Sequence, residues 1–301
     1  MSAIGRSPQH EGSIQRALMV APLIVALVVL TLVPFIFTAA TSFTDFNLTR
    51  PSRWSFVGLE QYVRLVNDPR WWSTFWRGLS FIIIPTLLQM GFGLALALLL
   101  HKGIRALKYF RAFFLLPMVL PPVVVGVIWK IFLLRDVGGM NAFTDILGLP
   151  FFGFLESASG AYWAIILIVT WEWTPFVMLF ILAGLETLPE EVFEAARIDG
   201  AGVLQEIRYI ALPLLKPTLL VVLLFRIMES TKIFPIIFSV TNGGPAQATE
   251  NMDFYAYLVG FRFFDFGYSS ALLVAILFVL GLICAPLFPA LVGAGRKADS
   301  E

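Results

Sequence analysis

Six apolar stretches constrain this chain more than any other feature of its sequence. They run near residues 17–43, 78–100, 110–134, 161–185, 214–240 and 269–292. A helix needs about 20 consecutive, mostly apolar residues to cross a bilayer, and each stretch is long enough. The stretches therefore predict an all-α integral membrane protein with six transmembrane helices.

The composition agrees with a membrane protein and excludes several other classes. Hydrophobic residues make up 58% of the chain and charged residues only 14%, whereas soluble domains carry about 25% charged residues. The net charge of +1 gives no general attraction for nucleic acid. Cys284 is the single cysteine, so no internal disulfide is possible. The two histidines, His10 and His101, lack ligand-spaced partners, so we expect no metal site.

Prolines interrupt several of the apolar stretches. They are Pro34, Pro85, Pro117, Pro121, Pro122, Pro175 and Pro235. Proline removes a backbone hydrogen bond, and in lipid the freed carbonyl needs another partner. The prolines therefore favour a bundle of kinked helices that lines a cavity.

The distribution of Lys and Arg predicts the orientation. Eleven of these residues fall on the side of the two termini and seven on the opposite side. Basic residues concentrate on the cytoplasmic side of membrane proteins, so both termini are predicted to be cytoplasmic. This gives an N-terminal tail over 1–16, a transmembrane domain over 17–292 and a C-terminal tail over 293–301. The arginine-rich first outer loop is the exception, and we interpret it as a folded interfacial segment of undefined structure.

The loop after the fourth stretch, about 186–213, has its own helical pattern. Thr187 and Glu190 fit a capping box at the start of a helix. Residues 199–202, Asp-Gly-Ala-Gly, break that helix, and a second short helix over about 203–211 is predicted to stop at Pro213. The loop is therefore predicted to be helix, glycine turn, helix.

The first of these two helices has a face of small and apolar side chains: Val192, Ala195, Ala196 and Ile198. Such a face can dock into a groove on a partner protein. An ordinary amphipathic connector would show the same pattern. The residues alone leave both interpretations open.

The run from Glu194 to Ala201, Glu-Ala-Ala-Arg-Ile-Asp-Gly-Ala, followed by Leu212-Pro213, closely resembles the "EAA" loop. That loop is typical of the membrane subunits of binding-protein-dependent ABC importers. Other stretches resemble the carbohydrate, maltose-permease-like branch of that family. They are Val57–Tyr62, Gly93–Ala97, Ala183–Leu185 and Thr241–Pro245. The resemblance covers about residues 17–290.

The resemblance implies a fold and a function. The fold would be that of a type I ABC importer permease, and the function ATP-driven import of a sugar or polyol across the bacterial inner membrane. The partners would be a second homologous permease subunit, two ABC ATPase subunits and an extracytoplasmic sugar-binding protein. The loop would be the coupling helix that meets the ATPase. Its coupling residues would be Glu194, Ala195, Ala196, Asp199, Gly200 and Ala201.

The chain has no phosphate-binding Gly-x-x-x-x-Gly-Lys-Ser/Thr motif, which an ATPase of this kind requires. We therefore expect a transport subunit and not an enzyme. No cofactor is expected in this chain, and ATP with Mg²⁺ would be bound by the partner ATPase subunits.

Charged residues inside the apolar stretches are candidates for the substrate pathway, because a charge at the bilayer centre is costly and usually faces a cavity or a partner. Arg226 and Glu229 are spaced to pair on one helix face, and Lys232 can share Glu229. The resemblance implies that Glu229, Ser230 and Lys232 line a sugar site. A structural ion pair, or a contact with the second membrane subunit, is the alternative.

The fourth stretch adds Glu172 and Trp173 to these candidates. An aromatic ring can stack on the C–H face of a sugar, and a carboxylate accepts hydrogen bonds from hydroxyl groups. Anchoring of the tryptophan at the membrane interface remains the alternative.

Two further classes of function were considered. A gradient-driven secondary transporter of a small polar solute would use Glu172 or Glu229 as a proton relay. Such carriers often contain inverted repeats, and this sequence has none that we find. A membrane-embedded enzyme would need a catalytic cluster that the chain lacks. The sequence does not identify the sugar or polyol, the substrate contacts or the partner subunits.

Overall fold

The computed structural model describes residues 8–52, 54–101, 115–135, 137–148, 153–287 and 289, with side chains from Met19 onward. These residues are mostly helical, and their only β pairing consists of two isolated bridges, Thr44–Phe56 and Asn47–Asp265. The prediction of an all-α protein is confirmed.

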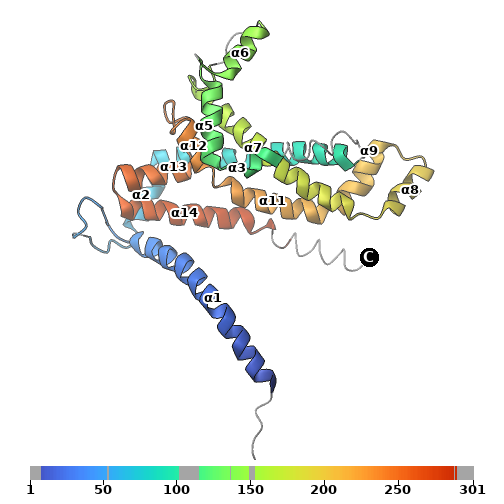
Figure 1. Cartoon of the computed structure of the whole chain (residues 1–301). Coiled ribbons are helices and arrows are strands. Elements are labelled where there is room, and N and C mark those ends of the chain that lie inside the picture. Colours follow the sequence, from blue (N-terminus) through green and yellow to red (C-terminus); the bar gives the residue numbers. More distant parts are fainter. Residues whose placement is uncertain are drawn as a thin grey trace, which may run out of the picture. The chain divides into compact units, whose positions relative to one another are not determined.

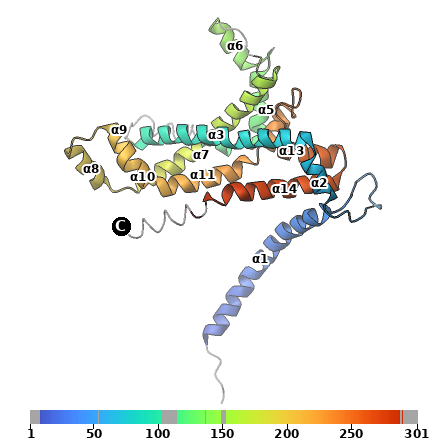
Figure 2. The same ribbon diagram turned by 180° about the vertical axis from the view of Figure 1, so that it is seen from behind.

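The helices fall into two compact units (Figures 1 and 2). Unit 1 comprises residues 1–67 and 258–274 and contains α1 (Pro8–Thr41), α2 (Glu60–Val66) and the π-helical η2 (Leu258–Arg262). Unit 2 comprises residues 68–257 and 275–301. Its helices are α3 (Pro69–His101), α5 (Pro122–Leu133), α6 (Gly139–Ile146), α7 (Ala158–Glu186), α8 (Glu190–Ile198), α9 (Val203–Gln205), the π-helical η1 (Glu206–Ala211), α10 (Leu212–Leu214), α11 (Lys216–Ser230), α12 (Phe234–Val240) and α13 (Met252–Tyr257). The helix α14 (Phe266–Cys284) begins in unit 1 and ends in unit 2.

Four helices of the described chain are long and apolar enough to cross a membrane: residues Met19–Thr41 of α1, and α3, α7 and α14. They correspond to the predicted first, second, fourth and sixth stretches. A fifth span results if Val203–Leu214 and Lys216–Ser230, which meet at an angle of 69°, are taken together. The second predicted helix starts earlier than expected, at Pro69 instead of residue 78.

The predicted third and fifth stretches are not single helices. Of the third, residues 110–114 lie outside the described part, and the rest is interrupted at Pro121 before α5 begins. The fifth is interrupted between Ser230 and Phe234. Pro122 and Pro235 lie in the first turns of α5 and α12, where the missing N–H of proline has no helical partner to lose. Only some of the prolines coincide with interruptions, because Pro34, Pro85 and Pro175 lie inside the continuous helices α1, α3 and α7.

The core of unit 2 is built on the contact between α3 and α7, which run side by side in both views (Figures 1 and 2). Gly93 makes this contact close, since a Cβ atom there would lie 2.6 Å from Cγ1 of Val177. The buried cluster around it combines residues of α3, α7, η1 and α11: Ala97, Leu100, Val177, Met178, Ile181, Leu182, Leu185, Ala211, Leu215 and Val222. The α3–α7 pair is thus the frame on which α11 packs.

Unit 1 contains the arginine-rich first outer loop as far as Asn67, and the described residues of this part are folded. The hydroxyl groups of Ser42 and Tyr62 lie 2.7 Å apart, and Gln61 Nε2 donates to the Thr44 carbonyl at 3.1 Å. Arg64 forms an ion pair with Asp265 at 2.6 Å. The part of the predicted first outer loop from Pro69 onward, which contains Trp71, Trp72 and Trp76, instead belongs to α3.

Candidate functional site

The segment from α8 to α10 has the predicted helix–turn–helix form. It lies at the end of unit 2 opposite α13 (Figures 1 and 2). Gly200 forms the turn with a φ of +83°, a left-handed conformation that favours glycine. A Cβ atom on Gly200 would meet nothing within 4 Å, so the backbone conformation and not space requires the glycine.

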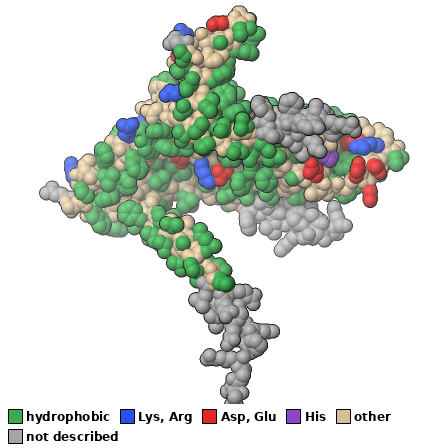
Figure 3. All heavy atoms as spheres, viewed as in Figure 1, with side chains coloured by type: hydrophobic (Ala, Val, Ile, Leu, Met, Phe, Trp, Pro, Cys, Tyr) green, Lys and Arg blue, Asp and Glu red, His purple; other side chains and the backbone are tan. Residues whose placement is uncertain are grey.

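None of the residues of α8 is buried. Phe193 is half-buried against the core of unit 2, whereas Ile198 is 86% exposed and Val192 is also exposed. Of the six predicted coupling residues, Ala196 and Ala201 are half-buried and the other four are exposed. Figure 3 shows acidic and basic side chains gathered at this end of unit 2, whereas hydrophobic side chains cover most of its middle. The surface is therefore open to a partner protein.

An ion pair fixes the geometry of this segment. Arg197 Nε on α8 lies 3.0 Å from Glu206 Oε1 on η1, and the side chain of Arg197 is 58% exposed. The hydrogen bond to Glu206 holds the pKa of the Arg197 guanidinium above its usual value. Gln205 Oε1 accepts a hydrogen bond from the N–H of Gly202 at 2.7 Å. The ion pair connects α8 to the helix that follows the turn, and the Gln205 contact lies at the start of α9.

Two details predicted for this segment are wrong. Thr187 does not cap α8, because its Oγ1 donates to the Gly184 carbonyl at 2.8 Å, and the N-cap position is occupied by Pro189. The second helix does not stop at Pro213 but continues to Leu214, with π-helical geometry in η1. Pro213 lies in the first turn of α10, where it is tolerated.

A cavity of about 210 Å³ lies inside unit 2, and all six predicted substrate-pathway residues line it. Glu172 and Trp173 come from α7, Arg226, Glu229 and Ser230 from α11, and Lys232 from the break before α12. Pro235 and Ile236 of α12 form part of the wall. The six residues therefore lie around one cavity, and their role in a substrate pathway stays a prediction.

Arg226 is the most enclosed charge of this cavity, with 1% of its surface exposed. Its Nε donates to Gln89 Oε1 at 2.9 Å and its Nη2 to Ser230 Oγ at 3.2 Å. Its Cζ lies 4.5 Å from the centroid of the Trp173 ring, a cation–π distance. Its Nη1 is buried and has no hydrogen-bond partner in the described part of the chain.

The predicted ion pair between Arg226 and Glu229 does not form. Glu229 Oε1 instead pairs with Lys232 Nζ at 2.8 Å. The predicted contact between Lys232 and Glu229 is therefore confirmed. Arg226 is directed to Gln89 on α3, which is fully buried and itself donates from Nε2 to the Val169 carbonyl at 2.9 Å. A distant polar residue is therefore the partner, and not the neighbour on the same helix.

Gln89 and Thr86 are site residues that the sequence reasoning missed. Thr86 Oγ1 lies 3.1 Å from Ser230 Oγ, and both side chains are buried. A signal existed, because Gln89 is an amide in the middle of an apolar stretch, where polar side chains usually face a protein interior.

The cavity can recognise a small polar ligand but offers no metal site. Arg226 and Lys232 provide donors, and the carboxylates of Glu172 and Glu229 provide acceptors, so the formal charges balance. No group of three potential metal ligands occurs among the residues that could be searched. The site therefore offers both donors and acceptors of hydrogen bonds.

The family described as "Binding-protein-dependent transport system inner membrane component" matches residues 89–295. This match covers the cavity and the whole α8–α10 segment. The chain belongs to this family of ABC transporter permeases.

Relatives of this permease agree along nearly the whole chain. The sulfoquinovosyl glycerol transport system permease protein of Agrobacterium fabrum is 34% identical over 273 residues, which are 90% of this chain and 88% of the relative. The trehalose/maltose transport system permease protein of Thermococcus litoralis is 32% identical over 265 residues, 88% of this chain and 89% of the relative.

A solved structure supports the fold. The bacterial alginate ABC transporter in complex with its alginate pentasaccharide-bound periplasmic protein contains a chain with a TM-score of 0.78, at 20% identity. The similarity covers 92% of the permease and 94% of that chain. The permease has the type I fold and is a multi-pass membrane protein. It is a transport subunit, and separate subunits of the transporter hydrolyse ATP.

Proposed function

We propose that this permease imports a sugar or a polyol, and that ATP hydrolysed by separate subunits drives the import. The names of its relatives, which include trehalose, maltose and sulfoquinovosyl glycerol transport, support this class of substrate. The observation that carries the proposal is the convergence of six polar and aromatic candidates on one cavity.

The chemistry of the cavity suits a ligand with many hydroxyl groups. The unpaired Nη1 of Arg226 is a buried donor held in place by Gln89, Ser230 and Trp173, so a ligand oxygen would satisfy it. Glu172, which is 2% exposed, offers carboxylate oxygens to ligand hydroxyl groups. Both contacts are directional, and neither requires a charged ligand.

The size of the cavity points to a second subunit. Ligand pockets usually enclose about 300–1,000 Å³, and this one encloses about 210 Å³. A homologous permease that packs against this chain would complete the chamber. We therefore include such a subunit in the proposed complex.

The α8–α10 segment would couple this chamber to ATP. In the proposal α8 docks into a cleft of an ABC ATPase, with Glu194 in contact and Gly200 forming the turn. Two such ATPase subunits bind ATP and Mg²⁺, close on each other and move α8. The α3–α7 frame, on which α11 packs, carries this motion to the cavity, which then opens to the opposite side. An extracytoplasmic binding protein delivers the substrate.

This arrangement requires α8 and both termini to be cytoplasmic and the permease to lie in the bacterial inner membrane. The excess of Lys and Arg on the side of the termini supports this orientation.

The first test is to tag the permease, to solubilise it gently from its native membrane and to identify the co-purifying proteins by mass spectrometry. Recovery with an ABC ATPase and a second permease is the expected result, and the associated binding protein can then be screened against sugars. Recovery of the chain alone, with transport intact after it is reconstituted alone, would contradict the proposal and indicate a gradient-driven carrier.

A further inference from the structure

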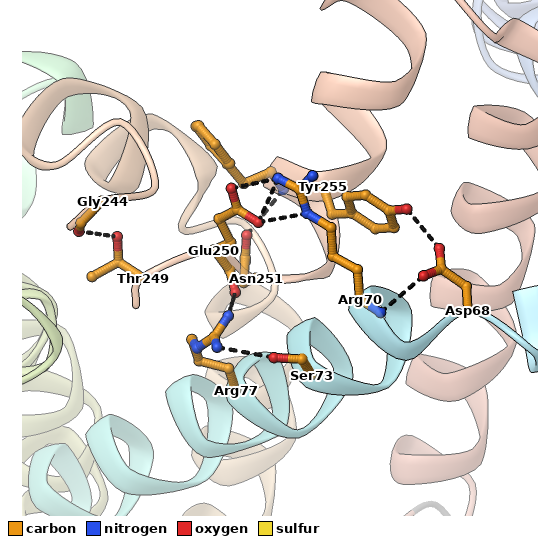
Figure 4. Close-up of polar contacts among 10 residues, drawn as sticks. Asp68, Arg70, Ser73, Arg77, Gly244, Thr249, Glu250, Asn251 and Tyr255 are labelled. Atoms are coloured by element: carbon orange, nitrogen blue, oxygen red, sulfur yellow. Dashed lines mark hydrogen bonds and ion pairs between the residues drawn. The ribbon is translucent and has the colours of Figure 1, made fainter. Parts of the chain in front are cut away.

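A polar network at the α13 end of unit 2 joins the start of α3 to residues 241–251 (Figure 4). Arg70 holds the carboxylate of Glu250 with two prongs, Nε to Oε2 at 3.0 Å and Nη2 to Oε1 at 2.8 Å. Arg77, two turns further along α3, donates from Nη1 to the Glu250 backbone carbonyl at 2.7 Å. The side chain of Glu250 is 6% exposed, so this ion pair is largely buried.

Two further residues hold Arg70 in place. The carboxylate of Asp68 accepts a hydrogen bond from the Arg70 backbone N–H at 2.8 Å and one from the Tyr255 hydroxyl at 2.6 Å. The Cζ of Arg70 lies 5.0 Å from the centroid of the Tyr255 ring. We call Asp68, Arg70, Arg77, Glu250 and Tyr255 the clamp. It joins α3, the loop 241–251 and α13.

The loop that the clamp holds has an unusual backbone. Asn242, Ala246 and Gln247 have φ values of 49°, 47° and 64°. These values lie in the left-handed region, which residues other than glycine rarely adopt. Such conformations persist where surrounding contacts impose them. Thr249 Oγ1 donates to the Gly244 carbonyl at 3.0 Å inside the loop (Figure 4), and the clamp supplies the contacts from outside.

The loop is directly continuous with the wall of the cavity. The helix α12 ends at Val240, where the loop begins, and its first turn contributes Pro235 and Ile236 to the cavity. On its other side α12 is separated from α11 by the break after Ser230. The clamp therefore acts beyond the C-terminal end of α12, and the N-terminal end of α12 follows an interruption of the helical structure.

We propose that Arg70 and Arg77 are positioning residues, which keep α12 in place as the wall of the cavity by holding Glu250. The meaning of that wall for transport rests on the proposed function. Removal of one partner leaves a buried charge unpaired, so the loop would separate from α3 more often. The helix α12, which packs on α5, α7 and α13, would then lose the support of the loop at its C-terminal end. The structure of the cavity would thus depend on an ion pair that does not itself line the cavity.

The test uses the full chain in open membrane sheets, which expose both faces. Cys284 is replaced by Ser, and Ile236→Cys places a thiol in the cavity wall, where Ile236 is 2% exposed. The rate of labelling by a small maleimide measures how often the wall opens. Glu250→Gln and Arg70→Gln are expected to raise this rate about tenfold, as in other local openings of a fold. Arg70→Lys keeps the charge but loses the two-pronged geometry, and should give an intermediate rate.

Two controls separate positioning from general loss of structure. Arg135→Gln breaks an exposed ion pair with Glu156 in the same unit and should leave the labelling rate unchanged. A thiol at Ala164, which is 1% exposed on α7, should stay protected in the clamp variants.

Unchanged labelling at position 236 in Glu250→Gln and Arg70→Gln would overturn the proposal, as would equal labelling at positions 164 and 236. The assay needs neither ATP nor substrate. Purification of the chain without an ATPase would therefore contradict the proposed function, but it would not affect the labelling result for Arg70 and Glu250.

Discussion

The segment around α8 and the cavity lined by Arg226 differ in how far their side chains are buried. In α8 no residue is buried, and Ile198 is 86% exposed. In the cavity, Arg226, Glu172 and Ser230 are each no more than 2% exposed, and hydrogen bonds to α3 hold Arg226 and Ser230. An exposed segment depends on a partner protein for its contacts, whereas a buried polar site also supports the fold. Substitutions in α8 should therefore affect transport alone, and those in the cavity both transport and stability.

The largest effect is expected for Arg226→Ala. The change removes the hydrogen bonds to Gln89 and Ser230, leaves these buried groups short of a partner and opens a hole beside Trp173. We expect a loss of about 2–4 kcal/mol in the free energy of unfolding. Thermal unfolding of the purified permease measures it.

Arg226→Met sharpens the same comparison, because it keeps most of the side-chain volume without the charge. The hydrogen bonds to Gln89 and Ser230 are lost in this variant too, but no hole opens, so we expect a smaller loss than for Arg226→Ala, about 1–2 kcal/mol. Uptake of the substrate found through the binding protein should nevertheless be lost. Normal uptake by the methionine variant would remove Arg226 from the substrate pathway.

Gly200→Ala should have the next largest effect on stability. A left-handed conformation costs an L-residue about 1–2 kcal/mol, and no clash adds to this because a Cβ atom meets nothing nearby. Uptake should be lost while the amount of permease in the membrane stays constant.

Gly148→Ala is the matched control for this change. Gly148 has a φ of +64°, and a Cβ atom there also meets nothing within 4 Å, but it follows α6, away from α8. The backbone cost is the same and uptake should be normal. Equal loss of uptake in both variants would mean that the cost in stability, and not the coupling turn, is responsible.

Breaking the ion pair between Arg197 and Glu206 should have a small effect on stability. Arg197 is exposed, and exposed pairs contribute little. We expect the melting temperature of Arg197→Gln to change by no more than about 2 °C. The ATP hydrolysed per substrate imported should increase, because α8 is then less firmly connected to η1. An unchanged ratio in the reconstituted complex would leave this pair without a role in coupling.

Thr187→Ala should have the smallest effect. The Thr187 side chain does not cap α8, so we expect a change within about 0.5 kcal/mol. Ser157→Ala is the comparison, since Ser157 Oγ accepts the Gly160 N–H at 3.1 Å at the start of α7, and loss of such a cap costs about 1 kcal/mol. If thermal unfolding showed a larger loss of stability for Thr187→Ala than for Ser157→Ala, Thr187 would after all cap α8.

What the sequence predicted well is local. The helix α8, the turn at Gly200 and the interruptions near Pro122 and Pro235 follow from spacing and from residues with strong conformational preferences. The segment of α8 was also found from its resemblance to a family. These features can be predicted without knowing which helices become neighbours in the folded chain.

What the sequence missed is determined by distant contacts. Arg226 was assigned to Glu229 three residues away, but its partner Gln89 is on another helix, 137 residues earlier in the chain. The clamp between Arg70 and Glu250 joins residues 180 apart. Thr187 is the exception, because its Oγ1 donates to the Gly184 carbonyl only three residues earlier. One sequence indicates which side chains are unusual but not which helices become neighbours.

The π-helical turn η1 has a consequence for changes in chain length. A π-helical turn accommodates an extra residue within a helix, and each residue of an α-helix rotates the following chain by about 100°. Deletion of one residue between Glu206 and Ala211 should therefore restore regular α-helix and leave the orientation of α11 relative to α8 unchanged. Deletion of a second residue would exceed what the turn accommodates and would rotate α11 by about 100°. Among related permeases, this loop should therefore tolerate the loss of one residue better than the loss of two.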